Sequence, residues 1–185
     1  MKRIIFLISL VIFSITSISV QAKRLQAYMS YSTFLSPADG PYIETYMIVV
    51  GHSVKFVKNQ NNKFQGNIEI TMIFRQDSVI KDFKKYNLHS PEVEDTNAIN
   101  FNFIDQQRFL VAEGTYDVEI VIDDVNDNAI PFKGYETIEM SFPKDQVSIS
   151  GIELIDTYKK TDSVNILTKN GYELMPYIIY YYPEK

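Results

Sequence analysis

Two histidines are the residues of this chain best suited to acid–base chemistry at neutral pH. His52 follows a glycine at the end of a predicted strand, and His89 precedes Ser90 and Pro91. Neither histidine stands in an HExxH or HxH pattern, so zinc has no ready pair of ligands. The chain has no cysteine, no GxSxG elbow and no glycine-rich phosphate loop, which argues against thiol, esterase-type and nucleotide-dependent enzymes. We therefore predict no catalytic residues and no enzymatic activity.

Three glutamates on predicted strands are the remaining candidates for acid–base work. Glu44, Glu69 and Glu119 are single carboxylates with basic or polar neighbours. An acid–base mechanism needs a positioned partner for each of them. The alternation of the strands predicts instead that these side chains face solvent.

An acidic turn forms the candidate metal site. Calcium prefers clusters of carboxylate and amide oxygens, and this turn is rich in them. It fits the first half of an EF-hand loop, but Ala129 replaces the required glycine and Tyr135 the closing glutamate. It is more similar to the cadherin inter-repeat linker. Asn and Asp also suit a plain polar hairpin loop, so we expect no cofactor. Calcium stays the alternative, with these ligands: Asp123, Asp124, Asn126, Asp127 and Asn128.

Tyrosine is abundant, with 13 residues and no tryptophan in the chain. Four tyrosines lie close together near the end: Tyr177, Tyr180, Tyr181 and Tyr182. Tyrosine anchors protein partners, and it also stacks on sugars. We expect these residues to contact a partner, with glycan binding as the alternative.

The elements that must position these residues are strands, because apolar residues recur with period two and no segment shows a helical stripe. Polar turns separate the predicted strands, and one short helical turn is expected over 105–109. The predicted strands cover 42–50, 54–58, 67–74, 79–86, 99–103, 114–123, 135–142, 147–158 and 177–182. This pattern predicts an all-β, antiparallel, immunoglobulin-like or fibronectin-like sandwich, with the main sandwich over about 41–145 and flanking strands.

One tyrosine fits a specific position of such sandwiches. Tyr116 comes two residues after Gly114, at the start of a long alternating strand. The tyrosine corner of immunoglobulin-like domains stands at this place. An ordinary core tyrosine is the alternative.

The first 22 residues predict a signal peptide. Lys2 and Arg3 precede an apolar run over 4–18, and small residues end the segment at Ala22. We expect cleavage between Ala22 and Lys23, which leaves a mature region over 23–185 and no transmembrane segment. The formal net charge of −5 argues against binding nucleic acid, which requires clustered Lys and Arg.

Four pieces of sequence resemble one family. They are YIETYM at 42–47, GTYDVEI at 114–120, ISGIEL at 149–154 and KNGYELMP at 169–176. In this order they resemble the N-terminal β-rich region of the GWxTD-domain proteins of Bacteroidetes, although the GWxTD motif itself is absent here. The resemblance implies an exported envelope protein without an assigned catalytic activity, and it supplies no site residues.

Together these observations predict an exported, non-catalytic structural or protein-interaction module of the bacterial cell envelope, periplasmic or associated with the outer membrane. Its expected partner is an envelope protein or a downstream domain of the same protein. The apolar end of the chain leads us to expect a longer protein that continues beyond Lys185. The alternative function is a ligand-binding or adhesion module, either a glycan binder or a calcium-stiffened cadherin-like repeat.

Overall fold

A three-stranded antiparallel sheet forms one layer of the fold. The computed structural model describes residues 24–145 and 147–178 of the chain. The strands of this sheet are β1 (Ala27–Ser36), β2 (Gly40–Val50) and β6 (Asn102–Leu110), in the order β1-β2-β6. β1 pairs with β2 along its whole length. The sandwich therefore begins at Ala27, earlier than the position near 41 expected from the sequence.

A larger antiparallel sheet forms the second layer. Its strands are β3 (Phe56–Lys58), β4 (Phe64–Gln76), β5 (Val79–His89), β7 (Gly114–Asp124) and β8 (Phe132–Met140). β4 pairs with both β5 and β7, and β8 pairs with β7. The short β3 pairs with the beginning of β4. Two 3-10 turns, Gly51–Ser53 and Thr96–Ala98, lie in the connections.

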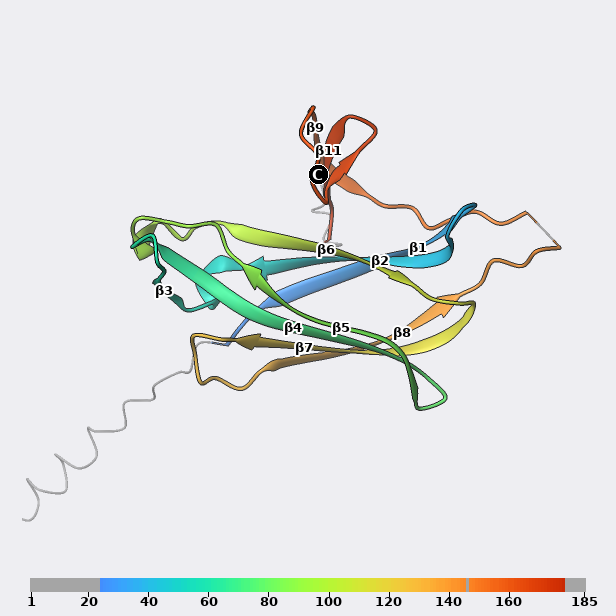
Figure 1. Cartoon of the computed structure of the whole chain (residues 1–185), viewed down its shortest axis with the longest axis horizontal. Helices are drawn as coiled ribbons and strands as arrows, with labels where there is room; N and C mark the ends of the chain where they lie inside the picture. Colours follow the sequence, from blue (N-terminus) through green and yellow to red (C-terminus); the bar gives the residue numbers. More distant parts are fainter. Residues whose placement is uncertain (1–23, 146, 179–185) are drawn as a thin grey trace, which may run out of the picture.

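The core lies between the two layers, which Figure 1 shows as two crossing sheets. The alternation predicted for β4 is confirmed, because Ile68, Ile70, Met72 and Phe74 are all fully buried. Full burial of one such side chain is worth about 1.5–3 kcal/mol, so this strand is a major source of stability. The rings of Phe74, Phe109 and Tyr116 meet at one end of the core. The predicted all-β antiparallel sandwich is therefore confirmed.

A two-residue turn joins β4 to β5. Asp77 and Ser78 adopt φ angles of 48° and 67°, and Gln76 pairs with Val79 across the turn. Two consecutive residues with positive φ match the twist of the flanking strands and close a tight hairpin. The turn predicted at this place is confirmed.

The helical turn predicted over 105–109 is wrong, because this segment is part of strand β6. Phe103, Asp105 and Phe109 alternate into the sandwich and are buried. The buried carboxylate of Asp105 accepts a hydrogen bond of 2.5 Å from the Tyr86 hydroxyl of β5. This bond satisfies the one charged residue that interrupts the apolar alternation of β6.

A small third sheet follows the sandwich. It contains β9 (Ile155–Lys160), β10 (Thr168–Lys169) and β11 (Tyr172–Pro176) in the order β10-β11-β9. We call residues 150–178 the C-terminal unit; Figure 1 places its strands next to β6 and β2. The predicted strand over 147–158 begins only at Ile155. Tyr177 and Ile178 are not in a strand, and the remainder of the segment predicted over 177–182 lies outside the described residues.

A turn of Asn170 and Gly171, with φ angles of 53° and 78°, connects β10 to β11. Glycine and asparagine tolerate this left-handed backbone better than other residues. Within residues 24–145 and 147–178, no helix is long and apolar enough to cross a membrane.

Candidate functional site

The strongest cluster of charges surrounds Glu44, in the middle of β2. Its side chain is fully buried and accepts hydrogen bonds from Tyr46 Oη at 2.7 Å and Lys169 Nζ at 2.8 Å. The guanidinium of Arg108 on β6 forms an ion pair with the other carboxylate oxygen. Lys169 also donates to Glu153 Oε2 at 2.9 Å. A residue of β2 is thereby joined to two residues of the C-terminal unit.

The electrostatics of this cluster keep Glu44 ionised. Burial alone would raise the pKa of Glu44, but hydrogen bonds from Lys169, Tyr46 and Arg108 outweigh this effect and hold the pKa below its ordinary value. Burial and the adjacent carboxylate raise the pKa of Tyr46. Two N–H groups of Arg108 donate to Oε1, and Tyr46, Gln106 and Lys169 donate to Oε2. The carboxylate is therefore fully hydrogen-bonded within the protein, and the cluster acts as a structural clamp.

Backbone contacts also hold the C-terminal unit on the sandwich. Gly151 N donates to Thr33 O at 2.6 Å, and Leu35 N donates to Ser150 Oγ at 3.2 Å. Both Thr33 and Leu35 belong to β1, so residues 150–151 cover part of the outer edge of this strand. That edge of the sheet is therefore occupied near Thr33.

The outer edge of β8 differs from that of β1, because no described residue covers its backbone. Val125 N donates to Asn67 O, which continues the register between β7 and β4. The odd-numbered residues of β7 therefore bond to β4, and its even-numbered residues bond to β8. By the same alternation, the odd-numbered residues of β8 direct their N–H and C=O groups away from β7. No backbone hydrogen bond from another described residue reaches that edge. Its four outward residues are Lys133, Tyr135, Thr137 and Glu139.

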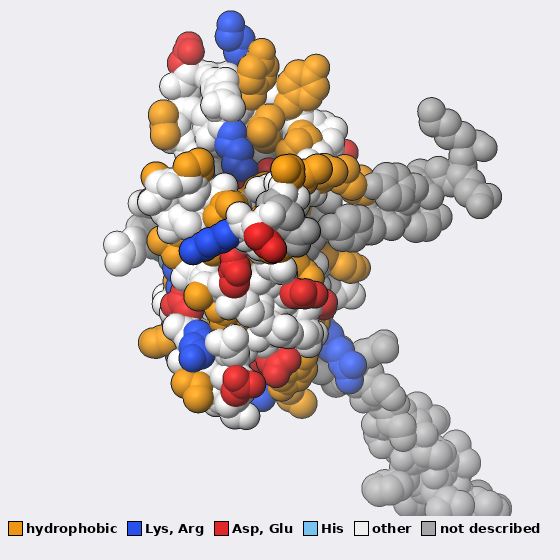
Figure 2. All heavy atoms as spheres, turned by 90° about the vertical axis from the view of Figure 1, so that its right-hand side faces the viewer, with side chains coloured by type: hydrophobic (Ala, Val, Ile, Leu, Met, Phe, Trp, Pro, Cys, Tyr) orange, Lys and Arg blue, Asp and Glu red, His pale blue; other side chains and the backbone are white. Residues whose placement is uncertain are grey.

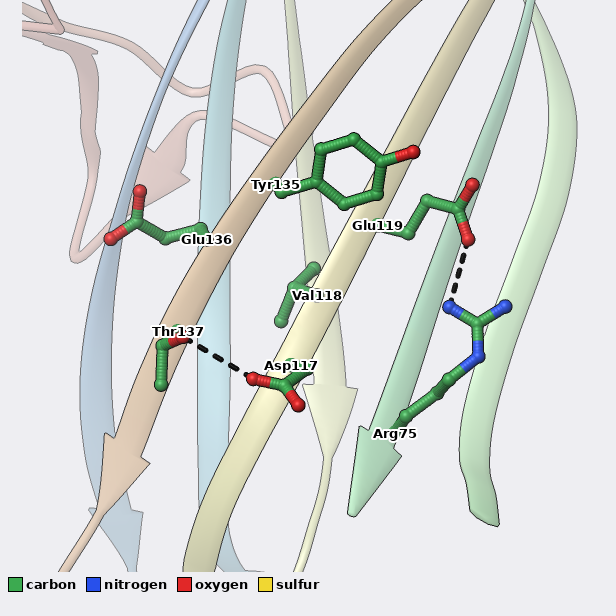
Figure 3. A pocket seen from close by; sticks show the side chains of 7 residues that line it. All are labelled: Arg75, Asp117, Val118, Glu119, Tyr135, Glu136 and Thr137. Carbon is green, nitrogen blue, oxygen red and sulfur yellow. Dashed lines mark hydrogen bonds and ion pairs between the residues drawn. The ribbon is translucent and has the colours of Figure 1, made fainter. Parts of the chain in front are cut away.

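A hollow of about 480 Å³ lies on the outer face of the sheet beside this edge. Figure 3 shows Tyr135 lying across β7 toward Glu119, whose carboxylate pairs with Arg75 at 2.8 Å. Asp117 accepts a hydrogen bond of 3.3 Å from the Thr137 hydroxyl. The lining residues are Arg75, Asp117, Val118, Glu119, Tyr135, Glu136 and Thr137.

A second hollow, of about 150 Å³, lies on the inner side of the same edge, between β8 and β1. Its lining is mostly apolar and includes Ala27, Met29, Phe132 and Gly134. Tyr135 and Glu136 line both hollows. Figure 3 shows Glu136 pointing from β8 away from β7. An open strand edge with a hollow on each side has the form of a site for an extended peptide.

The acidic turn uses its oxygens within the protein. Asp124 is 7% exposed and accepts hydrogen bonds from Lys55 N at 2.6 Å and Asn126 N at 3.0 Å. Burial raises the pKa of Asp124 despite these bonds. Asp127 lies 3.9 Å from Lys55 Nζ, and Asn128 N bonds to Asp127 Oδ1. Asp123 lies on β7. In the part of the chain that the structure describes, no three acidic, His or Cys side chains gather to hold a metal.

The histidines lie apart from these features. His52 and His89 are both exposed, one in the turn after β2 and one at the end of β5. Neither imidazole makes a hydrogen bond or ion pair that joins it to a serine or carboxylate of the described residues. The structure therefore does not bring them into one site.

The predicted partner contact at the end of the chain is only partly described. Tyr177 is half-buried, and its N–H donates to Leu154 O at 2.7 Å. Tyr180, Tyr181 and Tyr182 lie outside the described residues, as do Ala22 and Lys23 of the predicted signal cleavage site. Two other tyrosines of the C-terminal unit, Tyr158 and Tyr172, are exposed and meet edge to face. Figure 2 shows apolar side chains gathered on this unit.

The expectation that Glu44 faces solvent is wrong, and the clamp around it is a feature that sequence reasoning missed. Tyr42, Tyr46, Ile48 and Val50 share its face of β2, so that face is apolar apart from Glu44. A strand that is apolar on both faces is typically covered on both sides. This signal could have predicted the burial of Glu44 but not the identity of Lys169 as its partner.

A scan against protein-family models and a search of curated proteins both return no match for this chain.

Proposed function

We propose that this protein is an exported, non-catalytic interaction module of the bacterial cell envelope, which binds a protein partner by adding a strand to β8. The free edge of β8 carries the proposal. Its outward backbone groups, which no backbone hydrogen bond from another described residue reaches, lie between two hollows, whereas β1 is partly covered by residues 150–151. Strand addition uses such backbone groups for affinity and adjacent pockets for specificity.

An immunoglobulin-like framework is part of this proposal. The strand orders β1-β2-β6 and β5-β4-β7-β8 correspond to A-B-E and C′-C-F-G of such sandwiches. Tyr116 Oη donates to Ala112 O at 2.8 Å, which is the hydrogen bond of a tyrosine corner on the F strand. Domains of this architecture commonly serve recognition at cell surfaces, which supports a binding role.

The chemistry of the site also supports binding over catalysis. Glu119 is neutralised by Arg75, and Asp117 bonds to the hydroxyl of Thr137. Neither hollow contains a histidine or serine beside a carboxylate, which is the arrangement that nucleophilic catalysis requires. Export to the envelope rests on the basic, apolar and small-residue segments of the first 22 residues.

Site-specific photo-crosslinking in cells tests this function. A photoreactive residue at Tyr135 should capture an envelope protein, because the side chain borders the free edge and is 69% exposed. The matched control is Ile80 on β5, which is 53% exposed at the opposite side of the same sheet. The proposal fails if the two positions give equal yields, if Tyr135 captures nothing, or if the protein stays in the cytoplasm.

A further inference from the structure

We infer that Glu136 determines which strand β8 accepts: it rejects a second copy of this chain and admits a strand with a lysine or arginine on its inward face. This inference rests on the proposed function and names the specificity-determining residue of the same edge. An added strand pairs with the outward backbone groups of Lys133, Tyr135, Thr137 and Glu139. Each of its side chains then lies on the same face of the sheet as the side chain of the β8 residue opposite.

Glu136 is an inward-pointing charge on an edge strand. Ile138 and Met140 of β8 are buried in the core, and side chains two residues apart share one face of a strand, so Glu136 and Gly134 also belong to the inner face. Glu136 stays exposed because the edge beside it is open, and Figure 3 shows its side chain directed away from β7. Its carboxylate makes no ion pair or side-chain hydrogen bond with another described residue.

The inner hollow sets an apolar position next to this charge. Gly134 has no side chain and leaves room at the edge, while Met29, Phe132 and buried Ile120 line the space around it. The volume of about 150 Å³ accommodates an aliphatic or aromatic side chain. A residue of the added strand opposite Gly134 therefore favours an apolar side chain, because a polar one would lose water there without gaining a hydrogen bond.

The position opposite Glu136 favours a cation. It lies two residues farther along the added strand and on the same inward face. A lysine or arginine there would pair with the carboxylate at the rim of the hollow, where both charges keep contact with solvent. An apolar side chain would remove water from the carboxylate without replacing its hydrogen bonds, and an acidic side chain would repel it. The inward face of the partner strand thus carries a cation two residues from an apolar side chain.

The same carboxylate disfavours a second copy of this chain. Two β8 edges pair all their outward residues in one antiparallel register, which places Lys133 of each copy opposite Glu139 of the other. That register also places Glu136 of one copy opposite Glu136 of the other. Like charges directly opposite one another destabilise a strand pair, and an inward-pointing charge is a known protection of sheet edges against self-association. Glu136 therefore rejects one strand and admits another by the same charge.

Peptide binding to the exported form of the chain tests the admitted charge. The probe is a peptide of about eight residues, Thr-Val-Thr-Lys-Thr-Val-Thr-Val. When it pairs antiparallel with β8, its lysine lies opposite Glu136 and a valine lies opposite Gly134. One comparison peptide has glutamate in place of lysine, and the other exchanges lysine with the preceding threonine, which moves the charge to the outward face. We expect the probe to bind at least about tenfold more tightly than either comparison peptide.

Two variants of β8 separate the inward charge from general electrostatics. Glu136→Lys should reduce the affinity for the probe about tenfold and make the glutamate peptide the better ligand. Glu139→Lys is the matched control, because it makes the same charge change on the outer face of the same strand, and it should change the affinity by less than about threefold. The inference is overturned if a comparison peptide binds as well as the probe, or if the two variants have equal effects.

Sedimentation tests the rejection of a second copy. The wild type should remain monomeric, Glu136→Val should self-associate at the same protein concentration, and Glu139→Val should remain monomeric as the control. A wild-type dimer that pairs through β8, or a Glu136→Val variant that stays monomeric, would overturn this rejection. If photo-crosslinking at Tyr135 captures a partner but no peptide binds, the proposed function stands and the inferred partner chemistry is wrong.

Discussion

Lys169 Nζ of the C-terminal unit lies 2.8 Å from Oε2 of the buried Glu44. Glu44 stands on β2, the central strand of the sheet β1-β2-β6, and its side chain lies on the face of that sheet away from the core. The ammonium group also reaches Glu153 at 2.9 Å and lies above the ring of Phe34. Lys169 thus shares the neutralisation of the buried Glu44 charge with Arg108 and fixes the C-terminal unit against the sandwich.

Lys169→Met should therefore destabilise the protein strongly. Removal of one partner of a buried ion pair typically costs about 3–5 kcal/mol, and Arg108 remains to offset part of this cost. We expect a loss of about 2–3 kcal/mol in the free energy of unfolding, measured by urea denaturation. Lys159→Met, at an exposed position of β9, is the matched control and should change the free energy by less than about 0.5 kcal/mol. Equal effects of the two substitutions would contradict the clamp.

The pH dependence of stability should show that the ionised form of Glu44 stabilises the folded protein. The folded-state pKa of Glu44 lies below its ordinary value of 4.5, so its ionised form favours folding. The stability difference between the wild type and Glu44→Gln should be largest above pH 4.5 and should decrease as the pH falls through the lowered pKa. Parallel pH titrations of chemical denaturation measure this difference.

Asp124 supplies a control of opposite sign. Burial raises its pKa above the ordinary value of 3.8, so its contribution to stability falls as the pH rises from 3.8 through the raised pKa. The difference between the wild type and Asp124→Asn should therefore decrease with rising pH. A Glu44→Gln difference that is constant between pH 3 and pH 7 would show that Glu44 is not held ionised by the clamp.

The hydrogen bond of the Tyr116 hydroxyl should contribute a modest and specific stabilisation. Tyr116→Phe removes the hydrogen bond to Ala112 O but retains the ring packed against Phe74. We expect a loss of about 1 kcal/mol, the usual net value of such a bond, in thermal or urea unfolding. Tyr28→Phe, at a tyrosine that is 47% exposed, should have no measurable effect. If Tyr116→Phe is also neutral, Tyr116 stabilises the sandwich only through the packing of its ring.

Local patterns predicted the strands of the sandwich well where one face is apolar and the other polar. β4 is the clearest case, because four alternating apolar residues end in a polar two-residue turn. β6 could not be predicted in this way, because the charge of Asp105 on its inward face is compensated by Tyr86 on a strand of the other sheet. Such compensation is visible only when the sheets are assembled.

The candidate site could not be predicted from the sequence for a similar reason. Lys169 and Glu44 are far apart in the chain, and neither residue belongs to a motif. The free edge of β8 depends on which strand lies next to it, and the alternation of its own residues does not reveal this. The sequence predicted a strand over 135–142, but not the hollows on its two sides.

Residue-resolved amide exchange on β8 tests the central claim most directly. In the free protein, we predict fast exchange for the amides of Lys133, Tyr135, Thr137 and Glu139, and slow exchange for those of Gly134, Glu136 and Ile138, which bond to β7. Saturation with the partner captured by crosslinking at Tyr135 should slow exchange at the four odd-numbered positions alone. Odd-numbered amides that are already protected in the free monomer, or that remain fast when the partner is bound, would contradict strand addition at this edge.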